Sequence, residues 1–191
     1  MYELVADPNE VGQVAAHTGL VSTIGTLIFA ATASTCLFTA YTIGQIERTT
    51  VKWQKFLKIS GFFILLLLAD DLWQLHENFP TLLFGNLVEN DAFQNLGEAI
   101  VFSFYGLLFV LYLFKFRTIF YQTKLIPLFI AILFFGASTI IDIWLENISG
   151  HFVLEEGFKL LGIVSFSMYY FEVCHQQIKQ LNKRNEQNLL H

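Results

Sequence analysis

Carboxylic acids lie near one end of four otherwise apolar stretches of this sequence. They are Asp70, Asp71, Glu98, Asp142, Glu155 and Glu156. A charged group in the middle of a membrane costs roughly 2.5 kcal/mol or more, so buried acids of this kind usually mark function. Several carboxylates at one place can bind a divalent cation or act as a general acid and a general base. Whether they act together depends on the elements that carry them.

Composition indicates what those elements are. The chain has 191 residues, of which 54% are hydrophobic and 14% charged, with 21 Phe and a net charge of -5. A soluble domain has roughly 25% charged residues. This composition excludes a disordered chain, a disulfide scaffold and a nucleic-acid-binding protein. We expect an all-α integral membrane protein in the plasma membrane or a bacterial inner membrane, with the lipid bilayer as its first partner.

Five apolar stretches reach the roughly 20 residues that a helix needs to cross a bilayer. They cover residues 18–45, 56–79, 92–114, 125–148 and 152–176 of a single transmembrane domain, and a polar tail follows at 177–191. All Lys and Arg residues except Lys159 lie on one side of these spans. The positive-inside rule makes that side cytoplasmic. The sequence therefore predicts a five-helix bundle with an exoplasmic N-terminus and a cytoplasmic C-terminus.

The acids then fall in one layer. At a rise of 1.5 Å per residue, Asp70, Asp71, Glu98, Asp142 and Lys159 lie roughly 6 to 12 Å inside the exoplasmic boundary. With Glu77, Glu146, Glu155 and Glu156, this makes eight carboxyls against one ammonium. So many carboxylates cannot all stay ionised at low dielectric. Retained protons, bound divalent cations, or side chains that reach the aqueous boundary would each resolve the excess.

Helical phase indicates which groups can meet. At about 100° per residue, Asp70 and Glu77 share a stripe, whereas Asp71 turns toward a flank. Lys159 follows Glu156 by three residues and Glu155 by four, so we expect at least one ion pair inside that helix.

One interpretation is a divalent-metal site, with Zn, Fe, Mn or Ca as the candidate ions. The predicted ligands are Asp70, Asp71, His76, Glu77, Glu98, Asp142 and Glu156. The Glu-x-x-His spacing of helical di-metal sites is missing at His76. Only His76 and His151 are near the layer, too few for a three-His zinc site. The other interpretation is a hydrogen-bonded network that fixes helix register and binds no ligand.

The leading functional prediction is a hydrolase that acts on a membrane-embedded substrate. Its predicted catalytic residues are Asp70, Glu77, Glu98, Asp142, Glu155 and Lys159. A metal ion would activate water, or a protonated and an ionised carboxyl would serve as acid and base. The alternatives are a proton or cation channel or transporter that acts as a homo-oligomer, and a structural subunit of a membrane complex. The inner halves of the spans carry hydroxyls mainly in 18–45 and 152–176, which favours a pocket open to one side.

A short resemblance accompanies the last span. Residues 155–159 read EEGFK and fit an EExxK pattern, which resembles the first motif of PrsW-type glutamic intramembrane proteases. The match covers five residues, and that family's further motifs on later helices have no counterpart after this span. The resemblance therefore does not assign protease activity to this chain. Cys36 and Cys174 lack a CxxC spacing, and we expect them to be buried free thiols.

Overall fold

The computed structural model describes residues 19–46, 51–73, 75, 91–144 and 151–189. Every regular element in these ranges is a helix, so the predicted all-α class is confirmed. The elements are α3 (Leu20–Ile46), α4 (Val51–Trp73), α6 (Asp91–Lys115), α7 (Arg117–Phe120), α8 (Ile126–Trp144) and α9 (His151–Leu189).

Each long helix overlaps one predicted span, but several ends differ. Helix α4 begins at Val51, before the predicted start at residue 56, because Lys52 and Lys55 are good helix formers although they are charged. Helix α9 continues from the predicted span through the polar tail to Leu189. The short helix α7 was not predicted. The connections around residues 80–87 and 147–150 lie outside the described residues.

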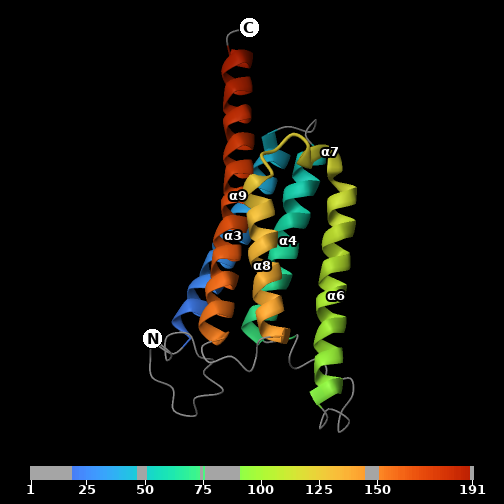
Figure 1. The fold of residues 1–191 in the computed structure, drawn as a ribbon. Helices are drawn as coiled ribbons and strands as arrows, with labels where there is room; N and C mark the ends of the chain where they lie inside the picture. The colour runs from blue at the N-terminus through green and yellow to red at the C-terminus, as the bar shows by residue number, and fades with distance from the viewer. Residues whose placement is uncertain (1–18, 47–50, 74, 76–90, 145–150, 190–191) are drawn as a thin grey trace.

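The helices form an elongated bundle (Figure 1). Helix α3 packs against α4 and α9, and α8 packs against α9. Helices α3, α6 and α9 run in one direction, while α4 and α8 run in the other. We call the end with the start of α9 and the ends of α4 and α8 the outer end, and the opposite end, with α7, the inner end. Helix α6 stands to one side of the others.

Aromatic side chains connect α6 to the bundle. Phe56 of α4 is fully buried, and its ring lies 5.7 Å from that of Tyr112 of α6 and 6.4 Å from that of Tyr170 of α9. Further toward the outer end, the Phe63 and Phe109 rings stack at 6.0 Å. Large rings can hold two helices together at a wide backbone separation. Helix α6 is therefore attached through side chains while its backbone stays apart.

The contact between α3 and α4 is close at Gly61. A Cβ at this position would lie 2.6 Å from Leu37 Cγ and 3.3 Å from the Ala33 carbonyl oxygen. Gly61 therefore lets the two backbones approach, as small residues do between packed membrane helices.

We expect Gly61→Leu to lower the free energy of unfolding by about 1–3 kcal/mol, because the added side chain overpacks this contact. Denaturant titration in detergent micelles measures it. Gly106→Leu is the matched control, since nothing lies within 4 Å of a Cβ there. Equal losses from the two substitutions would contradict the close contact.

One described helix is long and apolar enough to cross a membrane: residues Leu20–Gln45 of α3. The apolar segments Ala99–Lys115 and Ile126–Ile141 are shorter, in the range of 10–17 residues. Large hydrophobic side chains are nevertheless exposed on several helices. Phe38 of α3 is 69% exposed, Phe114 of α6 70%, and Leu133 of α8 72%.

Candidate functional site

Charged side chains from α4 and α9 meet at the outer end of the bundle. Lys159 Nζ of α9 lies 2.6 Å from Asp71 Oδ1 of α4 and 3.5 Å from Glu156 Oε1 of its own helix. The Asp71 side chain is only 5% exposed and that of Lys159 28%. An ammonium between two carboxylates offsets much of their mutual repulsion, so the three groups form a partly buried ion-pair network.

Asp70 belongs to a different contact. Its carboxylate is buried and accepts a hydrogen bond of 2.9 Å from the Tyr105 hydroxyl of α6. Consecutive helical residues are about 100° apart, so Asp70 faces α6 while Asp71 faces α9. We call Asp70, Asp71, Tyr105, Glu156 and Lys159 the outer charged cluster.

The carboxylate of Asp71 is not fully satisfied. Oδ1 contacts the Lys159 ammonium, whereas Oδ2 is buried and has no hydrogen-bond partner among the described residues. An ionised carboxylate can accept several hydrogen bonds, and a buried acceptor without one is costly. Within the described part of the chain, Asp71 Oδ2 therefore has the capacity to accept a hydrogen bond from a water or a substrate, or to bind a cation.

The structure brings together part of the predicted site. The ion pair expected inside the last helix is confirmed, and it joins Lys159 to Glu156. Asp71 is a second and closer partner of Lys159, which the sequence did not indicate. Glu155 is half-buried, one turn before Lys159 on α9.

The other predicted residues are described less fully. Glu98 lies on α6 and Asp142 on α8 near its outer end, but their side chains lie outside the description. His76 and Glu77 lie outside the described residues altogether. Tyr105 was missed, because a tyrosine in an apolar stretch looks like a packing residue. Its place seven residues after Glu98, two helical turns on the same face, was the available signal.

The described side chains of the cluster do not make a metal site by themselves. Among the residues whose side chains are described, no group of three or more His, Cys, Asp or Glu could hold a metal ion. Lys159 lies between Asp71 and Glu156, where a cation would otherwise neutralise them. The predicted metal site thus depends on Glu98, Asp142, His76 and Glu77.

An apolar layer lies next to the outer charged cluster, on the side of the inner end. Ile64, Ile163 and Phe166 are almost completely buried there. Eight residues, or roughly 12 Å of helix, separate Lys159 from Ser167, the next buried polar residue of α9. Ser167 accepts a hydrogen bond of 2.8 Å from the Thr32 hydroxyl. The outer charged cluster is therefore separated from the polar groups deeper in the bundle.

A hydroxyl network occupies the inner half. The Tyr112 hydroxyl lies 2.6 Å from Ser60 Oγ and 3.1 Å from the Tyr170 hydroxyl. It links α4, α6 and α9, whereas the sequence indicated inner-half hydroxyls mainly in the first and last spans. Cys36 and Cys174 are buried and free, as predicted.

A family model described as a domain of unknown function (DUF8692) matches residues 1–173, almost all of the chain before the polar end of α9. No curated protein and no solved structure matches.

Proposed function

The chain belongs to the DUF8692 family, and we propose that it is a five-span membrane protein whose outer charged cluster hydrolyses a substrate from the lipid phase. The observation that carries the proposal is Asp71: a buried carboxylate held by Lys159, with one oxygen that accepts no hydrogen bond from any described residue. The proposal has two parts, membrane insertion and chemistry, with separate support.

Exposed apolar faces support membrane insertion. On α6 the exposed side chains include Phe104, Leu107, Leu111 and Phe114, which follow each other at helical spacing. A similar face on α8 includes Ile126, Phe129, Ile130 and Leu133. Soluble monomers rarely expose contiguous apolar patches larger than a few hundred Å². We propose that lipid covers these faces and that α3, α4, α6, α8 and α9 all cross the bilayer.

The distribution of charge supports one orientation. Lys115, Arg117 and Lys124 follow one another around α7 at the inner end. The outer charged cluster lies at the opposite end, where Lys159 is its only basic residue. By the positive-inside rule the α7 end is cytoplasmic, and the cluster opens toward the exoplasmic side.

The proposed chemistry follows from the contacts of Asp71. Its Oδ2 accepts a proton from water, and the resulting hydroxide attacks the carbonyl carbon of an ester or amide. The Lys159 ammonium stabilises the oxyanion, and the proton from Asp71 passes to the leaving oxygen or nitrogen as the bond breaks. In the second form of this proposal Asp70, Glu98, Asp142 and the His76–Glu77 segment would hold a divalent cation, which would supply Lewis-acid chemistry toward the carbonyl group.

Asp71→Asn in purified protein in lipid nanodiscs tests the chemistry. We expect it to lower the rate on fluorogenic ester and amide lipids by about 10²–10⁴-fold, since the amide cannot take the proton. Glu172→Gln, at the inner end, is the control and should retain full activity. Hydrolysis that survives Asp71→Asn would overturn the assignment.

Elemental analysis distinguishes the metal-assisted form of the proposal from the form that uses Asp71 and Lys159 alone. A stoichiometric divalent metal that is lost in Asp70→Ala, Glu98→Ala and Asp142→Ala would support the metal-assisted form. Full hydrolysis by metal-free protein would support the form that uses Asp71 and Lys159 alone.

Ion conduction by an oligomer is the competing function. The apolar layer of Ile64, Ile163 and Phe166 argues against a path through one chain, since conduction needs polar groups or water along its whole length. Proton or cation flux into liposomes, abolished by Asp71→Asn, would favour conduction over hydrolysis.

A further inference from the structure

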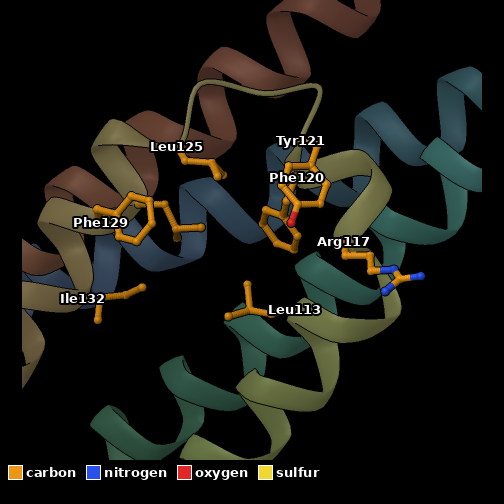
Figure 2. A pocket seen from close by; sticks show the side chains of 8 residues that line it. Leu113, Arg117, Phe120, Tyr121, Leu125, Phe129 and Ile132 are labelled. Carbon is orange, nitrogen blue, oxygen red and sulfur yellow. The ribbon is translucent and has the colours of Figure 1, made fainter.

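A second candidate site lies at the inner end, far from the outer charged cluster. A cavity of about 290 Å³ lies between α6, α7 and α8. Figure 2 shows Leu113 of α6 on one side of it and Phe129 and Ile132 of α8 on the other. Of all the lining side chains, only those of Arg117 and Tyr121 are polar. The cavity is therefore a hydrocarbon slot with polar groups on its α7 side.

Arg117 is the charged residue of this slot. It is exposed, and its guanidinium points away from the apolar side chains (Figure 2). None of the carboxylates among the described residues forms an ion pair with it, whereas nearby Lys124 pairs with Glu172 at 3.3 Å. A guanidinium binds phosphate through two parallel hydrogen bonds, which a lysine cannot reproduce. Arg117 is therefore available for an anionic group beside the slot.

The size of the cavity favours one occupant. A single turn of helix, about 10 Å wide and 5.4 Å long, fills roughly 400 Å³. The slot is too small to enclose that, so a helix of a partner or of a second copy does not fit inside it. An acyl chain is narrow and wholly apolar, so a segment of it can enter the slot lengthwise, against the leucine, isoleucine and phenylalanine walls.

We propose that this slot binds an anionic phospholipid of the inner leaflet, with one acyl chain between α6 and α8 and the headgroup phosphate on Arg117. Basic pockets between membrane helices on the cytoplasmic side are suited to such headgroups. Tyr121, 84% exposed, lies in the same wall, where its ring and hydroxyl suit the boundary between chains and headgroups. The inference depends on the proposed membrane insertion and its orientation but not on the chemistry of the outer charged cluster.

Native mass spectrometry of the full chain, released from nanodiscs of phosphatidylglycerol and phosphatidylcholine, tests the proposal. We expect one phosphatidylglycerol to be retained about tenfold more often than phosphatidylcholine of the same chains. Arg117→Gln should abolish this preference. Ile132→Trp, which fills the slot from a 41% exposed position, should prevent retention of either lipid.

Each of the two variants has a matched control. Lys52→Gln removes an exposed basic residue of α4, and Ile130→Trp adds the same ring at a 39% exposed position of α8 that does not line the slot. Both should bind lipid as the unmodified chain does. Equal losses in a variant and its control would overturn the proposal.

Other outcomes identify other occupants. Displacement of the lipid by inorganic phosphate would show a headgroup site without a chain, contrary to the proposal. A change in oligomeric state in Ile132→Trp with lipid retention unchanged would show that a second copy covers the slot. A chain that stays in solution without detergent would contradict membrane insertion itself.

Discussion

Lys159→Met is expected to destabilise the protein by about 3–5 kcal/mol, the usual result when one partner of a buried ion pair is removed. Asp71 would remain 5% exposed, with neither oxygen near a cation. Glu156 would lose the same partner. Denaturant titration of the purified variant in micelles measures the loss.

The double variant Lys159→Met/Asp71→Leu distinguishes the cost of an unpaired buried charge from the cost of lost side-chain packing. We expect it to recover most of the lost stability, because a buried ion pair replaced by apolar side chains is often neutral or better. Lys124→Gln is the control, since its ion pair with Glu172 is largely exposed and should be worth less than about 1 kcal/mol. If Lys159→Met costs no more than Lys124→Gln, the outer charged cluster does not contribute to stability.

Leu133→Lys is expected to raise the insertion free energy of α8, and so to disfavour its insertion, by about 3–4 kcal/mol. Leu133 is 72% exposed, so on a soluble protein the same substitution would change stability by no more than about 0.5 kcal/mol. The two environments thus predict clearly different results for one residue. A microsomal insertion assay, together with the free energy of unfolding in micelles, measures the effect.

Thr118→Lys is the matched control for the membrane test. It adds the same charge at an exposed position of α7, at the inner end, where basic residues are favoured. We expect normal insertion and stability. If Leu133→Lys is as harmless as Thr118→Lys, lipid does not cover the exposed face of α8.

The long helices could be predicted because their apolar runs are continuous, yet their ends could not. Hydropathy marks the part of a helix suited to lipid, not the residues at which backbone hydrogen bonding stops. Helix α4 therefore begins before its apolar run, at Val51, and α9 continues after it to Leu189. Helix α7, with four residues, is too short to produce a periodic pattern.

In the candidate site, only the contact between residues of the same helix could be predicted from the sequence. Glu156 and Lys159 are three residues apart on one helix, so their ion pair follows from helical geometry. The contact of Lys159 with Asp71 depends on how α4 is rotated against α9, which no spacing within either helix determines. The hydrogen bond from Tyr105 to Asp70 depends in the same way on α6.

Helices α3 and α9 lie side by side although they are the first and last described helices of the chain. Thr32, which is fully buried, finds its side-chain partner in Ser167, 135 residues later. At a synthesis rate of 5–20 residues per second, a nascent Thr32 waits on the order of ten seconds for that partner. During synthesis α3 therefore lacks this neighbour until α9 has been made, and any ribosomal stall before Ser167 prolongs that state.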